Sequence, residues 1–455
     1  MTLDHHREVV MSAANPIETR DSTPLGTQQW LPFTPNREFL ADPKLFASAS
    51  RQHYYDASGR AILDGSSGLF TTPAGHGRQE IAQAVYDQLL KMDFCAGFTR
   101  AHAGSFALAE RLAGLLPEPL NHVFFASSGS DAVDTAMKIS IAYHRARREP
   151  SRTMFVSRER AYHGSNLSGT ALSGMVNNRR AFGNPVSGVV HMRHTWLPEQ
   201  RMQPGQPTVG AELADDLLRL IQLHGAENIA ACVVEPVAGS TGTLVPPVGY
   251  LDRLRELCTT HGILLVFDEV ICGFGRTGES FAAQSFGVTP DIITMAKAIT
   301  NGAIPMSAVA VSDEIYRTVI DSAVDDGIEF FHGYTWSGHP VACAAALATQ
   351  DIYANERLFE RGRALSPYFL NQLHTLADLP AVFDIRGYGM IAGIEIHPDG
   401  KPGQRGHRLQ KHLFEQGLHL KATGDTAILA PPLIFEREDV DRMIGLLRDA
   451  LAALD

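Results

Sequence analysis

Short, almost wholly apolar runs alternate with amphipathic segments through the middle of this 455-residue chain, and this alternation restricts its fold more than any other feature. Residues 229–234, 263–267, 292–295 and 308–311 form apolar runs of strand length. Residues 211–224 and a second segment ending at Gly262 carry leucines at helical spacing. Strands that are apolar on both faces and separated by helices are typical of a mainly parallel sheet covered by helices. The sequence therefore predicts an α/β domain.

The last third of the chain has a different pattern. Short strand segments within 384–396 and 427–429 mix with amphipathic helices such as 438–454, which is typical of a smaller α+β domain. A chain of this length also exceeds what one compact core usually holds. We therefore expect an N-terminal arm at residues 1–29, an N-terminal part of the small domain at 30–75, a large domain at 76–339 and a C-terminal part of the small domain at 340–455.

Composition and charge exclude several classes of function. The chain has 39 Lys and Arg against 50 Asp and Glu, and its net charge of -11 gives nucleic acids and anionic membranes no general electrostatic attraction. Its five cysteines are scattered and never spaced as Cys-x-x-Cys, which is typical of free thiols in a reducing compartment and not of a zinc site. Neither a signal peptide nor an apolar stretch of membrane-spanning length is present. We expect a cytoplasmic protein without a metal centre.

Ionisable side chains follow three of the predicted strands. Glu235 follows 229–234, Asp268 and Glu269 follow 263–267, and Lys297 comes soon after 292–295. The carboxyl ends of parallel strands meet at one edge of the sheet, where ligands bind. Each residue alone is more often just the polar end of a strand, but together they favour a functional site.

Two sequence patterns near this edge also resemble nucleotide-binding motifs. Asp268 and Glu269 after a buried strand also occur in nucleotide hydrolases, but the chain has no Gly-x-x-x-x-Gly-Lys-Ser/Thr loop. Residues 273–278 fit the Gly-x-Gly-x-x-Gly pattern of dinucleotide folds, yet acids precede them and no long helix follows. We predict a tight loop there, with a nicotinamide-dependent oxidoreductase as the alternative from a different class.

A phosphate site is predicted where residues 123–126, a short strand, lead into a helix. Ser127, Ser128, Gly129 and Ser130 lie at the helix start, where free backbone N–H groups and the helix dipole favour an anion. An ordinary N-cap accounts for one serine but not for three. A lysine, an acid and a phosphate site are together what pyridoxal phosphate requires. The lysine forms a Schiff base, the acid keeps the pyridine nitrogen protonated, and the helix start anchors the phosphate.

These residues belong to a longer, ordered series of motifs that begins at about Pro32. From there to its carboxyl end the chain resembles the class III (subgroup II) aminotransferases of fold type I, and among them the omega-amino acid:pyruvate or beta-alanine:pyruvate transaminases. The motifs that carry the resemblance span residues 32–37, 63–65, 75–78, 127–130, 162–164, 234–237, 267–270, 273–278, 296–298, 301–305 and 333–340.

The resemblance implies a role for each matching residue. Lys297 is expected to form the Schiff base and to move the substrate proton, and Asp268 to pair with the pyridine nitrogen. The cofactor-binding residues it implies are Ser128, Gly129, Ser130, Tyr162, His163, Asp268, Val270, Lys297 and Thr335 of the partner subunit. The implied substrate-binding residues are Phe33, Phe70, Tyr162, Lys421 and Tyr334 of the partner subunit. Without the resemblance, Tyr162-His163-Gly164 would be interpreted as a turn with a surface histidine.

The reaction implied is a ping-pong transfer of an amino group from an amine or omega-amino acid to a keto acid, expected to be pyruvate. Other enzymes of this cofactor class remain as alternatives: an aminotransferase using 2-oxoglutarate, an aminomutase or a decarboxylase. A non-catalytic binding protein is disfavoured because the lysine, the acid and the phosphate loop are all intact. A phosphate ligand from the partner subunit implies a homodimer as the minimal active unit, with a tetramer also open.

Two residues depart from the pattern of the family. Lys421 stands where relatives have an arginine that clamps the substrate carboxylate, and lysine offers a point charge in place of a planar fork. Phe70 stands where relatives commonly have tryptophan, so the pocket is expected to be larger. Together these departures predict an amine or a long omega-amino compound as donor, while the physiological donor stays undetermined.

Overall fold

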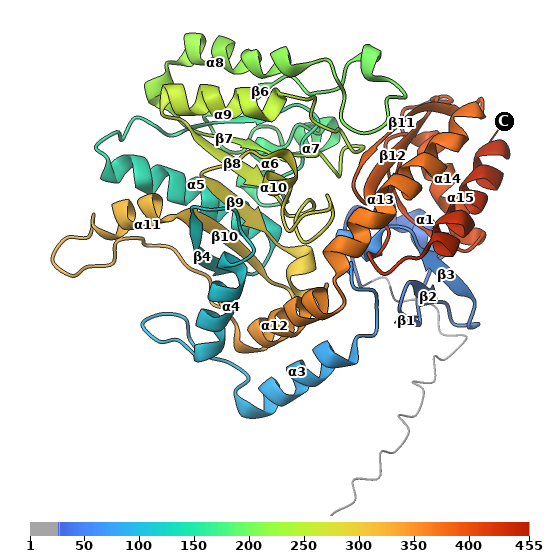
Figure 1. Cartoon of the computed structure of the whole chain (residues 1–455), viewed down its shortest axis with the longest axis horizontal. Helices are drawn as coiled ribbons and strands as arrows, with labels where there is room; N and C mark the ends of the chain where they lie inside the picture. Colours follow the sequence, from blue (N-terminus) through green and yellow to red (C-terminus); the bar gives the residue numbers. More distant parts are fainter. Residues whose placement is uncertain (1–25, 27, 455) are drawn as a thin grey trace, which may run out of the picture.

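The computed structural model describes residue 26 and residues 28–454, so the arm expected at 1–29 lies almost wholly outside the described residues. A large twisted sheet with helices on both faces fills one side of Figure 1. A second part, on the right, is formed by segments from both ends of the described chain. Among the described helices, none has the length and apolar character needed to cross a membrane.

The large sheet has seven strands in the order β4-β10-β9-β8-β7-β5-β6. Five neighbouring strands, from β9 to β6, run parallel, and β10 is antiparallel to both of its neighbours. The prediction of a mainly parallel sheet is therefore confirmed. The bounds are Leu120–Ala126 for β4, Met154–Arg158 for β5, Val189–Met192 for β6, Ile229–Val234 for β7, Leu264–Asp268 for β8, Ile292–Met295 for β9 and Ser307–Ser312 for β10.

The central strands are apolar throughout because both faces of the sheet are covered. Along β7, Ala231 and Val233 face a cluster that includes α5, whereas Cys232 and Val234 face the opposite cluster, which includes α9. Alternate residues of one strand thus lie in two separate cores. The first cluster involves α5 (Gly129–Ala146), α6 (Leu167–Leu172) and α11 (Asp313–Ile320), and the second involves α4 (Ala103–Ala113), α8 (Asp216–His224), α9 (Tyr250–His261) and α12 (Pro340–Asn355).

The second part contains two smaller sheets. One joins β1 (Ser48–Ser50), β2 (His53–Tyr55) and β3 (Ala61–Asp64) to β13 (Leu418–His419), which runs parallel to β3. The other has the antiparallel order β11 (Val382–Tyr388), β12 (Ile391–Ile396), β15 (Thr426–Leu429), β14 (Lys421–Thr423). The helices of this part are α13 (Leu358–His374), α14 (Gln404–Glu415) and α15 (Arg437–Ala452). Both ends of the chain therefore build the predicted α+β part.

The predicted domain boundaries stay a prediction. Helix α12, which begins at the expected boundary of residue 340, packs against α3 (Gln79–Lys91), α4 and the 3-10 turn η4 (Lys297–Thr300). It thus lies against elements assigned to the large domain, although it is followed directly by α13 of the smaller part.

Two predicted elements differ in detail. Residues 211–215 form a separate 3-10 turn, and α8 begins only at Asp216, as is common at the start of a helix. Strand β8 runs to Asp268 because that residue still pairs with Thr294 of β9. The acid is therefore held within the sheet ladder and not in the loop after it.

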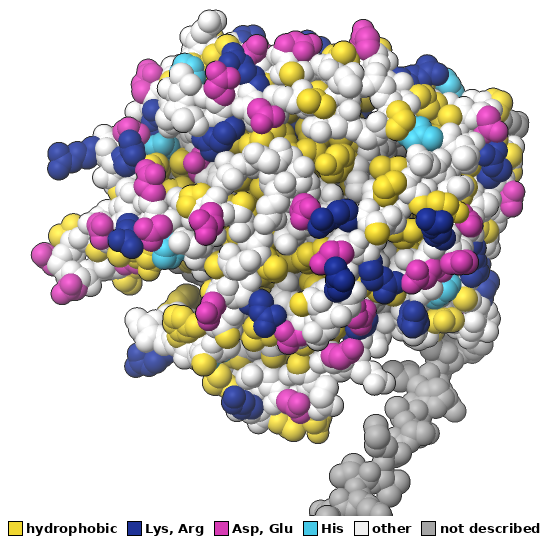
Figure 2. Space-filling model, viewed as in Figure 1, with side chains coloured by type: hydrophobic (Ala, Val, Ile, Leu, Met, Phe, Trp, Pro, Cys, Tyr) yellow, Lys and Arg dark blue, Asp and Glu magenta, His cyan; other side chains and the backbone are white. Residues whose placement is uncertain are grey.

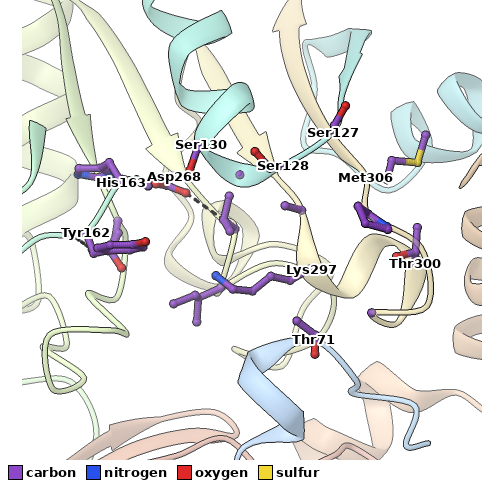
Figure 3. A pocket seen from close by; sticks show the side chains of 18 of the residues that line it. Thr71, Ser127, Ser128, Ser130, Tyr162, His163, Asp268, Lys297, Thr300 and Met306 are labelled. Atoms are coloured by element: carbon purple, nitrogen blue, oxygen red, sulfur yellow. Dashed lines mark hydrogen bonds and ion pairs between the residues drawn. The ribbon is translucent and has the colours of Figure 1, made fainter. Parts of the chain in front are cut away.

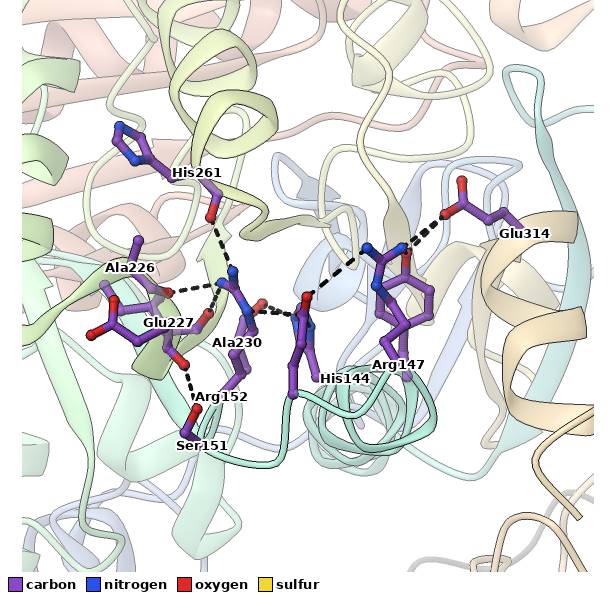
Figure 4. A network of polar contacts seen from close by, with 12 residues as sticks. His144, Arg147, Ser151, Arg152, Ala226, Glu227, Ala230, His261 and Glu314 are labelled. Carbon is purple, nitrogen blue, oxygen red and sulfur yellow. Dashed lines mark hydrogen bonds and ion pairs between the residues drawn. The ribbon is translucent and has the colours of Figure 1, made fainter.

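A polar network fixes the amino ends of the strands (Figure 4). Arg152, between α5 and β5, donates to the carbonyl oxygens of Ala226, Ile229 and His261 at 2.8, 3.0 and 3.2 Å. The buried His144 of α5 contacts the Ala230 carbonyl through Nε2 at 2.9 Å. These contacts tie α5, β7 and α9 together at the sheet edge opposite the strand carboxyl ends, and so fix the frame on which the other edge is built.

Candidate active site

A cavity of about 290 Å³ lies at the carboxyl ends of β7, β8 and β9 (Figure 3). Its lining residues come from segments that are far apart in the sequence, as expected for ligand sites in open parallel sheets. Of the predicted cofactor-binding residues, it is lined by Ser128, Gly129, Ser130, Tyr162, His163, Asp268, Val270 and Lys297, together with Ser127, Thr71, Glu235, Thr300 and Met306.

Lys297 opens the turn η4 directly after β9 and has a left-handed φ of 49°. In Figure 3 its side chain extends between Asp268 on one side and Thr71 on the other. Burial lowers the pKa of Lys297 to about 8, an effect that the charge of Asp268 opposes and that of Lys421 reinforces. An amine with such a pKa is available as a nucleophile and as a base near neutral pH.

The Asp268 carboxylate is held by three contacts. One oxygen lies 2.8 Å from Nδ1 of His163, and the other accepts from the Thr294 hydroxyl at 3.1 Å and the Val270 N–H at 3.2 Å. Since His163 is only 1% exposed, its interpretation as a surface histidine is wrong. Its ring instead contacts the Asp268 carboxylate through Nδ1, and its Nε2 has no hydrogen-bond partner among the described residues. The carboxylate is thereby fixed in one orientation.

The start of α5 has the geometry of an anion site. Ser128 caps the helix by accepting from the Asp131 N–H at 3.2 Å, and the Ser130 hydroxyl accepts from the Ser165 N–H at 2.9 Å. Gly129 lies so close to Val270 that an added Cβ would meet a valine methyl at 3.1 Å. Ser128 and Ser130 therefore have different roles, and the first N–H groups of this 18-residue helix lie at the cavity end of the sheet.

The two glutamates of the same edge act as hydrogen-bond acceptors. Glu235 accepts from the Tyr162 N–H at 3.0 Å and from the Gly239 N–H at 3.1 Å, and burial raises its pKa. Glu269 accepts from the first N–H groups of α10 (Ala282–Phe286), and burial raises its pKa to about 7. Both glutamates therefore have structural roles as hydrogen-bond acceptors, although Glu235 also lines the cavity.

Phe70 and Lys421 lie beside this cavity and are fixed by a common residue. The Ser66 hydroxyl donates to the Ile428 carbonyl at 3.0 Å and accepts from the Lys421 N–H at 3.2 Å. Phe70, in the short turn α2 (Ser67–Phe70), has a φ of 63°, a strained value for a bulky residue. The Nζ atoms of Lys297 and Lys421 each lie 5.8 Å from the centre of its ring.

The remaining predicted substrate residues lie further out. Phe33 is 80% exposed and meets Tyr162 edge to face, with ring centres 6.5 Å apart. Tyr334 and Thr335 do not line the cavity of their own chain, and the Tyr334 hydroxyl donates to the Asp131 carbonyl at 3.2 Å. Their expected contribution is to the pocket of a partner subunit, and it stays a prediction.

Thr71, Thr300 and Met306 line the cavity but were missed from the sequence. Thr300 lies three residues after Lys297 in the same helical turn, so the spacing alone could have indicated it. Thr71 reaches the cavity only because the segment after Gly68 crosses from the smaller part, a long-range packing that no local pattern reveals.

The glycine loop at 273–278 is buried away from the cavity. Arg276 donates to the carbonyl oxygens of Met390 and Pro431 at 3.0 and 2.7 Å. A Cβ on Gly275, which has a φ of 87°, would lie 2.5 Å from Phe359. The loop thus packs against α13 and the smaller part, as a tight turn should. Because the described residues of α13 and the smaller part cover this loop, its backbone is not accessible to a dinucleotide. The loop therefore does not support the oxidoreductase alternative.

Comparison with known proteins gives a consistent result. The family model described as Aminotransferase class-III matches residues 42–451. The omega-aminotransferase of Caulobacter vibrioides is 49% identical over 94% of this chain and 97% of its own length. The beta-alanine–pyruvate aminotransferase of Pseudomonas aeruginosa is 47% identical over 93% of this chain and 95% of its own.

Solved structures agree with the sequence relatives. A thermostable (S)-enantioselective omega-transaminase from Thermomicrobium roseum superposes with a TM-score of 0.88 at 36% identity, covering 93% of this chain and 96% of that chain. The omega transaminase from Pseudomonas jessenii in complex with PMP gives a TM-score of 0.89 at 31% identity, with 94% and 96% covered.

Proposed function

The chain belongs to the class III aminotransferases, which depend on pyridoxal phosphate, and on this premise we propose that it moves amino groups from an amine or omega-amino acid to pyruvate. The observation that carries the proposal is the Lys297 amine, which shares one cavity with Asp268 and with the start of α5. Support for pyruvate as acceptor comes from relatives named as pyruvate aminotransferases, including the putrescine–pyruvate aminotransferase of Pseudomonas aeruginosa at 36% identity.

The residues of the cavity fit pyridoxal phosphate. We propose that the N–H groups at Gly129 and Ser130 hold the phosphate, that Asp268 meets the pyridine nitrogen, and that Tyr162 and Val270 cover the two faces of the ring. When bound, this cofactor supplies an aldehyde that captures amines and a ring that draws electrons from the substrate carbon.

The chain's own residues then perform the proton transfers. With a pKa of about 8, the Lys297 nitrogen takes a proton from the substrate carbon and returns it without a large energetic cost in either direction. His163 and Thr294 hold the Asp268 carboxylate in place, so that its negative charge stays at one point throughout. Glu235 accepts a hydrogen bond from the Tyr162 N–H. It thereby fixes the backbone of the residue that is proposed to cover one face of the cofactor ring.

Substrate choice is proposed to depend on Lys421 and Phe70. Lys421 is half-buried and offers one point charge, which binds a carboxylate less tightly than a bidentate guanidinium does. Phe70 presents a ring smaller than an indole to the same space. We therefore propose that the donor is an amine or long omega-amino compound, and that a short amino acid is a poorer one.

The active unit is proposed to be a homodimer. Large apolar side chains are exposed in the segment 89–106 and in the loop 328–336, and part of this surface lies over α3 at the bottom of Figure 2. The two segments are neighbours, since a Cβ on Gly333 would lie 2.8 Å from Phe98. An apolar surface of this kind favours a second copy of the chain. The exposed residues are Leu89, Leu90, Phe94, Phe98, Phe106, Ile328, Phe331 and Trp336.

The same loop contains Tyr334 and Thr335, so a second copy seated there would bring them near the neighbouring cavity. We also propose that the protein works in the cytoplasm, because its five cysteines are all free.

Replacing Lys297 tests the assignment of the reaction. Lys297→Ala should abolish the near-visible absorption of the bound cofactor and lower the transamination rate at least about 10³-fold, because both the covalent attachment and the base are lost. Lys138→Ala, which removes a surface lysine paired with Asp134, is the matched control and should change neither. A colourless wild-type protein that binds NAD would contradict the proposal.

Donor choice is tested with two amines of the same size. Beta-alanine and isopentylamine differ in that two methyl groups replace the carboxylate oxygens, and we expect isopentylamine to have an equal or higher kcat/KM with pyruvate. Lys421→Arg should raise the relative efficiency of beta-alanine about tenfold, because a planar fork restores bidentate binding. A strong preference of the wild type for beta-alanine would rule out the proposed donor class.

The proposed interface is tested by introducing a charge. Phe331 is 86% exposed, and Phe331→Asp should convert the dimer to a monomer with reduced activity, since burying a charge is unfavourable. Phe182→Asp places the same charge on α7 (Val176–Phe182), where the side chain is 69% exposed, and should leave the dimer intact. Light scattering measures both masses, and an unaffected Phe331→Asp dimer would show that this surface is not the interface.

A further inference from the structure

Two lysine ammonium groups face the same aromatic ring. The Nζ atoms of Lys297 and Lys421 each lie 5.8 Å from the centre of the Phe70 ring, so they are separated by no more than twice that distance. Phe70 itself is buried. In the part of the chain that the structure describes, neither nitrogen has a carboxylate within ion-pair distance. The buried cation Arg386, by contrast, contacts both Asp384 and Glu395 at 2.7 Å.

The backbones that carry Lys421 and Phe70 are held to the same sheet. Lys421 pairs with Ile428 across β14 and β15, and both backbones contact the hydroxyl of Ser66. The turn that carries Phe70 is fixed at its start, because the two Asp64 oxygens accept from the N–H groups of Ser66 and Gly68. The backbone positions from which the Lys421 and Phe70 side chains extend are therefore set by one set of hydrogen bonds.

The groups that face Lys297 come from four elements. Asp268 from β8 and Glu235 after β7 favour its charged form, and so does Cys272 from the following loop, whereas Lys421 from β14 opposes it. Asp268 also contacts His163, and burial raises the pKa of Glu235, so Glu235 is a weaker counter-charge than a fully ionised carboxylate. Lys421 is the one positive charge in this set. Burial lowers the pKa of Lys421, and the charge of Glu235 opposes this effect.

We propose that Lys421 is a positioning residue for Lys297, and that its charge, which lies near the same buried Phe70 ring, stabilises the neutral state of the Lys297 nitrogen. The inference rests on the proposed function, because it is the neutral nitrogen that must attack and accept protons. Two charges at this separation, at an effective dielectric constant of about 20, change a pKa by about one pH unit.

This role differs from binding a substrate carboxylate. A carboxylate-binding lysine affects only donors that carry a carboxylate, and only while they are bound. A lysine that acts on Lys297 affects the resting enzyme and every donor alike, including an amine without any carboxylate. The two roles therefore separate in a measurement made before any substrate is added.

The test is a spectroscopic pH titration of the holoenzyme without substrate. The visible band reports protonation of the nitrogen through which Lys297 holds the cofactor, and Lys421→Met should raise the midpoint of its transition by about one pH unit. Lys421→Arg keeps the charge and should stay within about 0.3 pH unit of the wild type. Lys138→Met removes an exposed cation and should have no effect. The shift should persist in about 0.5 M salt, since a buried charge is poorly screened.

A Lys421→Met midpoint equal to that of the wild type would overturn the inference while leaving the proposed function intact. A wild-type protein with no visible band would contradict the proposed function and this inference with it. Should Lys421→Met fail to fold, Lys421→Gln carries the same expectation. Competitive acetylation of the cofactor-free chain provides a second readout: the pH at which Lys297 becomes half-reactive should rise in either variant.

Discussion

A lysine amine in a protein interior must either lose its charge or be given a counter-charge. Both effects act on Lys297: burial favours its neutral form, and a nearby carboxylate favours its charged form. The parallel sheet supplies Asp268 from the neighbouring strand, and the smaller part of the protein supplies a second cation, Lys421, near the same Phe70 ring. The balance leaves a nitrogen with a pKa of about 8. Much of the surrounding architecture serves to keep these few charges at fixed distances.

That fixation is built from both parts of the protein. The amino ends of the strands are tied by Arg152 and His144, which leaves the carboxyl ends free to carry the cavity. The β14–β15 ladder and the turn at Ser66 bring Phe70 and Lys421 to the same place from opposite ends of the chain. Both regions of the protein therefore shape the surroundings of Lys297, and a substitution in the smaller part is expected to change the pKa of the Lys297 nitrogen.

Local patterns were sufficient for the sheet and for the charged residues at its edge. The bounds of β7 and β9 agree with the predicted 229–234 and 292–295, because a strand buried on both faces must be apolar along its whole length. Position at a strand end then made Lys297 and Asp268 conspicuous. The helix start at Ser128 followed from its capping chemistry.

Features that depend on tertiary packing were not predictable in this way. Nothing near His163 in the sequence indicates that it braces Asp268, a residue more than a hundred positions away. The left-handed backbone at Phe70 is likewise a product of tertiary structure: it lies in a turn whose Ser66 contacts β15, whereas a phenylalanine by itself avoids that conformation. The same reason explains why Thr71 was missed and why the arrangement of two lysines around one ring emerges only in the fold.

The proposed reaction depends above all on Lys297 being the residue that holds the cofactor. Reduction of the purified holoenzyme with borohydride, followed by proteolysis and mass spectrometry, locates the covalently fixed cofactor directly. We expect a single phosphopyridoxyl group, on the peptide that contains Lys297. The same group on Lys421 or another lysine, or no modified lysine at all, would contradict it.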